Sequence, residues 1–210
     1  TCCPNRVARL TRLAGIRAQV GYKRRPGSYG GKPSLVVDNT LDRQFDVAAP
    51  DRVWVTDITY IRTQEGFAYL AVVIDLYSRR VVGWSMQSRQ TTDVVLQALH
   101  MAVWRRKPKH RVLIHSDQGS QFTSMDWAAF IRAQNLEHSM SRRGNCYDNA
   151  VIESWFSTVK SEEGERFESY AHAKEALFDY IEVFYNQRRR HSTLGQISPA
   201  EFERRAGHAA

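Results

Sequence analysis

The chain has 210 residues, of which 42% are hydrophobic, and it carries a formal net charge of +8. Such a length predicts one main domain of roughly 150 residues with an appendage. No apolar run approaches the roughly 18 residues that a membrane-spanning helix needs, so we expect no membrane segment. Three cysteines without a CxxC pair argue against a disulfide framework and a structural zinc site, and they favour a reducing, intracellular setting.

The positive charge is concentrated in parts of the chain. The first 37 residues contain eight Lys and Arg and no acid. Further basic clusters lie at residues 105–107, 142–143 and 188–190. This distribution indicates a polyanionic partner, with nucleic acid ahead of a membrane surface. The alternative is a soluble basic protein without such a partner.

The N-terminal region is predicted to hold one short helix. The sequence does not begin with Met and lacks the apolar stretch of a signal peptide, so we expect a processed chain or a piece of a longer protein. The helix is expected at residues 5–14, with Asn5 as its cap and Gly15 just after its end. Its apolar side consists of Val7, Leu10 and Leu13. Residues 26–33 have the composition of a linker, and irregular chain continues to Pro50.

Three strands are predicted next. Residues 53–61 are β-branched, aromatic and apolar on both faces, as is typical of a central strand. Residues 67–74 and 80–86 follow after short polar turns. Such short connections predict an antiparallel meander.

Helices and strands alternate in the rest of the chain. A helix capped by Thr91 or Thr92 is expected to end before Pro108, with an apolar face formed by Leu96, Leu99 and Val103. Residues 112–116 form a strand after that helix, so this strand is expected to lie parallel in the same sheet. The remaining predicted elements are a helix at 127–133, a strand at 136–140, a loop at 144–145 and helices at 149–163 and 171–188.

Three acids stand at positions suited to a site. Asp57 lies within the first central strand, and Asp117 follows the fourth strand. Ligand sites of open α/β sheets gather near strand ends. Glu153 lies on a helix whose buried face is predicted to contain Ile152, Trp155, Phe156 and Val159. Glu153, Ser157 and Lys160 form an adjacent polar stripe, so Glu153 can face a cleft.

The chemistry of these acids indicates a cation. Carboxylates about 5 Å apart repel one another by about 3 kcal/mol per pair at an effective dielectric constant of ~20. A divalent cation removes that cost, and hard oxygen ligands without a His or Cys set indicate Mg²⁺ or Mn²⁺. Two ions about 3.5–4 Å apart would clamp the oxygens of a phosphodiester, and Gly119 would let the phosphate backbone approach.

Other roles are open for each acid from the residues alone. An Asp at a strand end is commonly a cap or turn residue, and a Glu on an amphipathic helix is commonly on its solvated face. Asp75 is a rival for a metal role that spacing does not exclude.

The chain resembles the catalytic core of the DDE transposase and retroviral-type integrase superfamily. The greatest resemblance is to the second-frame transposase of the third bacterial insertion-sequence family. The segments that carry it are 54–60, 71–84, 115–122, 144–160, the tail 185–199 and the basic 6–17. The 35 residues between Asp117 and Glu153 match the spacing of that family's D-D-35-E motif. The resemblance covers nearly the whole chain.

The resemblance implies an RNase H-like α/β fold with a mixed five-stranded sheet flanked by helices. It implies a basic N-terminal appendage, a partial DNA-binding leader with its linker, at residues 1–46. The integrase-type catalytic core with a C-terminal helical extension would occupy residues 47–203. It also implies that Asp57, Asp117 and Glu153 are catalytic and bind two Mg²⁺ or Mn²⁺ ions, and that Asp75 is structural.

The implied activity is Mg²⁺-dependent transposition of a bacterial insertion sequence. Water cuts the DNA at an element end, and the resulting 3′-OH attacks another phosphodiester. Lys160 matches a family position near the DNA end, and His115 is either a neighbour of the site or a packed histidine. The other residues expected to contact DNA are Gln118, Gln121, Tyr147, Asn149, Arg142 and Arg143.

The implied partners are double-stranded DNA and further copies of the chain, with no membrane. A first-frame protein would supply recognition of the element ends, because its helix-turn-helix and leucine zipper are absent from this sequence. The expected location is the bacterial cytoplasm, in association with the nucleoid. Two rival hypotheses are another RNase H-like nuclease and a DNA-binding remnant without catalysis.

Overall fold

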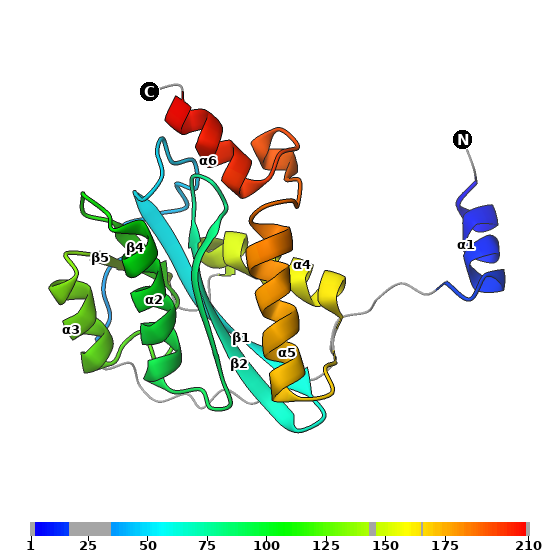
Figure 1. Cartoon of the computed structure of the whole chain (residues 1–210), viewed down its shortest axis with the longest axis horizontal. Coiled ribbons are helices and arrows are strands. Elements are labelled where there is room, and N and C mark those ends of the chain that lie inside the picture. Colours follow the sequence, from blue (N-terminus) through cyan, green and yellow to red (C-terminus); the bar gives the residue numbers. More distant parts are fainter. Residues whose placement is uncertain (1–2, 17–34, 143–145, 165, 209–210) are drawn as a thin grey trace.

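The computed structural model describes residues 3–16, 35–142, 146–164 and 166–208. From residue 35 on, the described residues form a sheet flanked by helices (Figure 1). The strands are β1 (Val53–Thr63), β2 (Gly66–Asp75), β3 (Val81–Gln87), β4 (Leu113–Ser116) and β5 (Glu137–Met140). The α-helices are α1 (Pro4–Leu13), α2 (Thr92–Arg106), α3 (Met125–Ala133), α4 (Ala150–Glu163), α5 (Tyr170–Phe178) and α6 (Pro199–His208). Shorter segments are the 3-10 helices η1 (Cys146–Asn149) and η3 (Ser192–Leu194) and the π-helix η2 (Asp179–Tyr185).

The strand order confirms the predicted mixed sheet. In the described chain, five strands pair in the order β3-β2-β1-β4-β5. β1, β2 and β3 form the expected antiparallel meander. β4 pairs in parallel with β1, and β5 pairs in parallel with β4. The long β1 therefore lies at the centre, with one antiparallel and one parallel neighbour.

Each face of the sheet has its own core. Successive side chains of a strand point to opposite faces, so neighbours in β1 enter different cores. Val55 packs with residues of α4, α5 and η2, whereas Trp54 packs with residues of α2 and α3. Burial of each such side chain contributes roughly 1.5–3 kcal/mol. The helices of each layer are therefore held by one face of the same strands.

The close packing of α2 on β3 depends on Gly83. A Cβ atom at this position would lie 2.1 Å from the carbonyl oxygen of Ala98 and 2.8 Å from the amide nitrogen of Ala102. Both atoms belong to the helix backbone and cannot rotate away. Glycine is therefore needed for this helix to lie against the sheet.

The C-terminal helix α6 is fixed by an ionic cluster. The carboxylate of Glu203 accepts hydrogen bonds from Ser78 Oγ at 2.7 Å, Arg80 Nη1 at 2.8 Å and Arg106 Nη1 at 2.9 Å. Burial by itself would raise the pKa of Glu203, but these partners hold it below its ordinary value. A carboxylate with this many donors stays ionised where it is buried. The expected C-terminal extension is thus tied to the turn between β2 and β3 and to α2.

Three local predictions were wrong. The first helix begins at Pro4, because proline fits the first helical position. Asn5 therefore falls inside the helix, and the N-cap is Cys3, whose side chain makes no cap hydrogen bond. The buried face of α2 contains Leu99 as expected, but its centre lies elsewhere. Its buried residues are Val94, Val95, Ala98, Leu99 and Ala102, and Leu96 and Val103 are only partly buried.

The single helix expected at 171–188 is divided. α5 ends at Phe178, and the backbone continues as the π-helix η2 to Tyr185. The side chain of Asn186 binds both the amide and the carbonyl of Val81, at 3.0 Å and 2.9 Å. The wider helical turn places Asn186 against this sheet edge, and hydrophobic periodicity does not distinguish the two kinds of turn.

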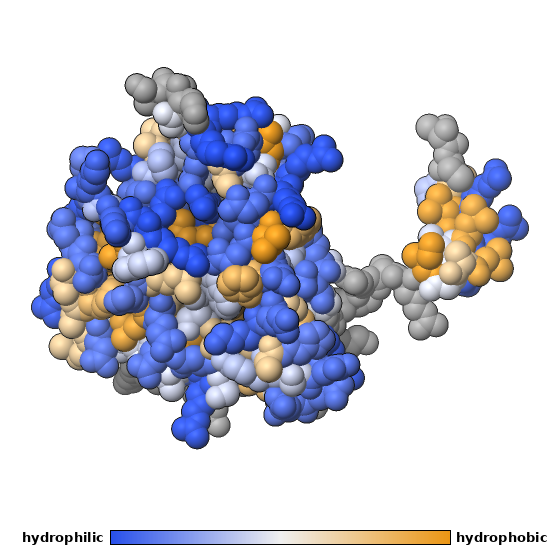
Figure 2. All heavy atoms as spheres, in the orientation of Figure 1, coloured by the Kyte–Doolittle hydropathy of each residue, from blue (hydrophilic) through white to orange (hydrophobic). Residues whose placement is uncertain are grey.

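The segments before β1 differ in their contacts with the core. α1 has no buried residue, and Leu13 is 76% exposed, so the apolar side of α1 remains at its surface (Figure 2). Leu41, in contrast, is buried in the same core as Val55.

The predicted linker at 26–33 lies outside the described residues, and the division at 46/47 stays a prediction. No helix among the described residues is both long and apolar enough to cross a membrane.

We expect Gly83→Ala to lower the free energy of unfolding by about 3 kcal/mol, because overpacking costs typically 1–3 kcal/mol and here the clash is with backbone. Urea denaturation would measure this change. Gly207→Ala is the matched control, since a Cβ atom there meets nothing within 4 Å and alanine favours a helix. Equal stability of the two variants would contradict the packing described for α2.

Candidate active site

Asp57 is placed by the centre of the sheet. It follows Val55 by two residues on β1, so both side chains point to the face that α4 and α5 cover. On β2 its partner is Val72. The backbone N–H of Ile58 donates to Asp57 Oδ1 at 2.7 Å. Asp57 is thus a partly buried acid held by its own strand.

Asp117 is placed by the parallel pairing of β4 with β1. Val55 is the partner of His115, and continuation of this register sets Asp117 beside Asp57 on the same face. The N–H of Gly119 donates to Asp117 Oδ1 at 2.8 Å. A Cβ atom on Gly119 would lie 2.8 Å from that oxygen, so glycine makes room for the carboxylate. Room for the Asp117 carboxylate is thus one reason for glycine at position 119, and the expected approach of a phosphate is another.

Glu153 is placed by α4. Ile152, Trp155, Phe156 and Val159 are buried as the sequence predicted, and Glu153 is exposed beside them. Residues of α4 pack in the same core as Val55 of β1. The helix therefore brings Glu153 to the face of the sheet on which Asp57 lies.

The electrostatics of Asp57 connect the three acids. Its pKa is raised well above the ordinary value by burial, by the negative charge of Asp117 and by that of Glu153. The Ile58 N–H and the positive charge of Lys160 act in the opposite direction. Burial also raises the pKa of Asp117, and the Gly119 N–H opposes the change. Asp117 and Glu153 are therefore close enough for their charges to oppose the ionisation of Asp57.

The donor set fits a divalent cation in its chemistry. Carboxylate oxygens are hard ligands of the kind that Mg²⁺ and Mn²⁺ prefer, and a cation would relieve the repulsion that raises the pKa of Asp57. In the described part of the chain, however, no three His, Cys, Asp or Glu side chains converge closely enough to hold a metal ion. The three carboxylates therefore suit a divalent cation in ligand type and charge, but their side chains are not arranged around a common point where an ion would be bound.

Asp75, the rival candidate, has its oxygens engaged elsewhere. Its carboxylate accepts hydrogen bonds from the N–H groups of Asp51 at 2.7 Å, Tyr77 at 2.9 Å and Ser78 at 3.0 Å. It is fully buried, and burial raises its pKa. A carboxylate used in this way fixes the turn after β2.

Lys160 lies at the edge of the acidic site. Its Nζ is 4.3 Å from the centre of the Tyr60 ring, and its charge acts on Asp57. Tyr60 is three residues after Asp57 on β1. The contact holds the ammonium group over an aromatic face, where a cation is attracted by the ring.

The other expected DNA contacts have mixed surroundings. Gln118 Nε2 donates to the carbonyl of Ser141 at 3.1 Å, and Gln121 Nε2 donates to that of Gln90 at 3.2 Å. Asn149 is 7% exposed. Arg142 forms an ion pair with Asp42, Arg143 lies outside the described residues, and Tyr147 is described only as part of η1. Contact of these residues with DNA stays a prediction.

Asp148 was missed by the sequence reasoning. Its buried carboxylate accepts hydrogen bonds from Asn39 Nδ2 at 2.9 Å, Arg43 Nε at 3.0 Å and the Arg142 N–H at 3.1 Å. Burial alone would raise its pKa, but these partners lower it. Asp148 ties residues 39–43 to η1, five residues before Glu153, and so positions the start of α4. Its place in the Asp148-Asn149 pair ahead of a helix was the available signal.

His115 is a packed histidine. Its Nδ1 lies 2.9 Å from Ser139 Oγ, which also accepts the N–H of Thr40 at 3.0 Å. Burial lowers the pKa of His115 to about 4, so the ring is neutral near pH 7. Through Ser139 the ring links β4 to β5 and to the segment before β1.

The comparisons first define the class of the protein. Two matches to the integrase core domain cover residues 47–146 and 134–199. A chain of the simian T-cell lymphotropic virus intasome, solved with PP2A regulatory subunit B56 gamma, superimposes with a TM-score of 0.63 at 14% identity over 82% of this chain and 60% of that chain. The HTLV-2 integrase catalytic core domain in complex with magnesium superimposes with a TM-score of 0.56 at 17% identity, over 74% of this chain and 97% of that chain. The fold is thus the RNase H-like fold of integrase cores.

Sequence relatives then define the family. Transposase InsF for insertion sequence IS3A of Escherichia coli (strain K12) is 46% identical over 94% of this chain and 69% of its own length. The transposase for insertion sequence element IS904 of Lactococcus lactis subsp. lactis (strain IL1403) is 42% identical over 95% of this chain and 79% of its own length. The chain belongs to the IS3 family of DDE transposases, which confirms the resemblance that the motifs indicated.

We expect Asp57→Asn to raise the melting temperature at pH 7 in the absence of divalent cations. Because the pKa of Asp57 is higher in the folded than in the unfolded chain, its ionisation costs stability as the pH rises through the folded pKa. A gain of about 1 kcal/mol corresponds to roughly 2–4 °C for a chain of this size. Calorimetry at pH 7 and at pH 4 would measure the gain, which should shrink at pH 4.

The matched control is Asp38→Asn, which removes an equal charge from an exposed side chain. Its melting temperature should change little at either pH. A fall in stability for Asp57→Asn at pH 7 would contradict the repulsion inferred among the three acids.

Proposed function

We propose that this chain is the catalytic part of a transposase that cuts DNA at the ends of an insertion sequence and joins those ends to a new site. The observation that supports the proposal is electrostatic: Asp117 at the end of β4 and Glu153 on α4 lie near enough to Asp57 of β1 for their charges to act on it. Its relatives are named as transposases of insertion sequences, and the matched domain is an integrase core.

The three acids would hold the divalent cations of the reaction, two Mg²⁺ or Mn²⁺ ions in our proposal. When bound, such cations supply Lewis-acid polarisation of the phosphodiester and activation of the attacking oxygen. Asp57 and Asp117 each have one oxygen fixed by a backbone N–H, which orients the carboxylates. Glu153 is exposed on its helix and would complete the set from the solvent side.

The reaction would be direct phosphoryl transfer at the DNA backbone. In the first step water attacks a phosphodiester at an element end, the P–O bond to the leaving 3′-oxygen breaks, and a 3′-OH results. In the second step that hydroxyl attacks another phosphodiester in line, and the displaced oxygen leaves. Lys160, held against Tyr60 beside Asp57, would meet a backbone phosphate near the reacting group.

Binding would use the basic surfaces of the chain and more than one copy of it. With a net charge of +8, the chain is suited to double-stranded DNA, and each phosphate contact adds about 0.9 to the salt dependence of binding. We propose that a first-frame partner supplies recognition of the element ends. The proposed place of action is the bacterial cytoplasm, at the nucleoid where the DNA lies.

We expect wild-type protein to resolve a branched DNA that mimics a strand-transfer product, in the presence of Mn²⁺. Asp117→Asn and Glu153→Gln should each lower the rate by about 10²-fold or more, the scale set by loss of one transition-state contact. Both variants should bind the same DNA as well as the wild type does. Gel electrophoresis of the products and fluorescence anisotropy would measure the two quantities.

The control for this assay is Asp126→Asn, an exposed acid in the first turn of α3. It should leave both rate and affinity unchanged. Wild-type activity in Asp117→Asn would contradict the placement of the site. Cleavage of RNA–DNA hybrid without strand joining would favour a nuclease of the same fold.

We expect the complex with DNA to contain at least two copies of the chain, because two element ends must be joined in one event. Light scattering coupled to size-exclusion chromatography would give the mass of the complex. A complex with one copy at every protein concentration would contradict this expectation.

A further inference from the structure

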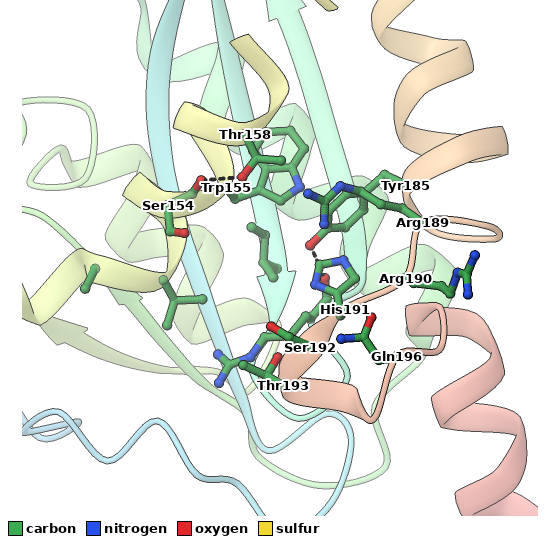
Figure 3. A pocket seen from close by; sticks show the side chains of 14 residues that line it. Ser154, Trp155, Thr158, Tyr185, Arg189, Arg190, His191, Ser192, Thr193 and Gln196 are labelled. Atoms are coloured by element: carbon green, nitrogen blue, oxygen red, sulfur yellow. Dashed lines mark hydrogen bonds between the residues drawn. The ribbon is translucent and has the colours of Figure 1, made fainter. Parts of the chain in front are cut away.

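A cavity lies on another face of α4 from the acidic site. Its volume is about 560 Å³, and Ser154 and Thr158 of α4 line it together with the segment from Tyr185 to Gln196 (Figure 3). At 100° per residue, Ser154 and Thr158 lie roughly 100–140° around the helix from Glu153, whereas Lys160 lies on the Glu153 side. The cavity is therefore separate from the site of the three acids.

The charge of this cavity is positive. Three arginines line it, namely Arg79, Arg189 and Arg190, and its described lining includes no Asp or Glu. From outside the lining, Glu162 binds Arg189 at 2.7 Å and the charges of Asp46 and Asp75 act on Arg79, which offsets part of the positive charge. An anion is the ligand that such a lining favours.

Side-chain nitrogens without partners belong to residues of the same lining. Of the five buried side-chain N and O atoms without a partner in the described residues, three belong to this lining: Arg79 Nη1, Trp155 Nε1 and His191 Nε2. Trp155 is only 4% exposed. The guanidinium and indole N–H groups donate and never accept. A phosphate oxygen that reaches these groups would supply the acceptor that the described residues do not.

His191 adds a neutral donor. Burial and the charges of Arg189 and Arg79 lower the pKa of His191 to about 4. The imidazole is then neutral near pH 7 and carries one N–H. Its ring packs edge-on against Tyr185, which in turn packs against Trp155, so the aromatic groups of the wall are held together.

We propose that this cavity binds a phosphate group, either a phosphodiester of DNA or a free phosphate. A phosphate offers several acceptor oxygens and no obligatory donor, which matches arginine forks and single N–H groups. The volume lies within the usual range of ligand sites and leaves room for the group that carries the phosphate. The DNA source rests on the proposed function, whereas the free phosphate does not.

The test follows the indole N–H of Trp155 by NMR in the ¹⁵N-labelled chain. The chain has five Trp, and the signal of Trp155 is identified by its loss in Trp155→Phe. Inorganic phosphate and a double-stranded oligonucleotide are titrated separately. We expect a saturable shift of this signal, and Arg190→Gln should weaken the response about tenfold.

Arg188→Gln is the matched control, because it removes the same charge from an exposed position two residues away and outside the lining. It should leave the Trp155 response to inorganic phosphate unchanged. A response to DNA alone would assign the phosphodiester, and a response to phosphate alone the free ion. No saturable response to either ligand, or equal weakening in both variants, would overturn the proposal. Since the readout is binding, loss of DNA cleavage would leave it standing.

Discussion

The parallel pairing of β1 with β4 sets two carboxylates of like charge on one face of the sheet, and α4 brings Glu153 near enough for its charge to act on Asp57. The register that sets Val55 against His115 continues to Asp57 and Asp117, so two acids that are 60 positions apart share one face of the sheet. Burial of Asp57 and the negative charges of Asp117 and Glu153 raise its pKa. The arrangement costs stability in the absence of a counter-charge, and it persists because the strands on either side are buried in two cores.

The remaining parts of the molecule support this pairing. Gly83 lets α2 lie against the meander, and the opposite face of the sheet is left for α4 and α5. Asp148 ties η1 to the segment before β1 and so sets the start of the helix that carries Glu153. The positions of the acids thus depend on packing against both faces of the sheet and on the buried Asp148 carboxylate with its three hydrogen-bond donors.

α4 separates two chemical environments. One side carries Glu153 and Lys160 next to the acids of the sheet, where negative charge predominates. The other side carries Trp155 and faces a cavity lined by arginines and unpartnered N–H groups. A helix of this kind would let DNA-directed chemistry and the binding of a phosphate occur on one rigid element, at different places on the surface.

The order of strands and helices along the chain could be predicted from the sequence, because hydrophobic periodicity is a local property of the chain. The choice of Asp57, Asp117 and Glu153 rests on the match of their spacing to a family motif, and it stays a prediction. The role of Asp75 depended on contacts with Asp51 and Ser78, which spacing does not reveal. The buried face of α2, the π-helix η2, the anchoring by Asp148 and the arginine-lined cavity were likewise decided by tertiary structure. Each arises from atoms far apart in sequence, and only packing determines which of them meet.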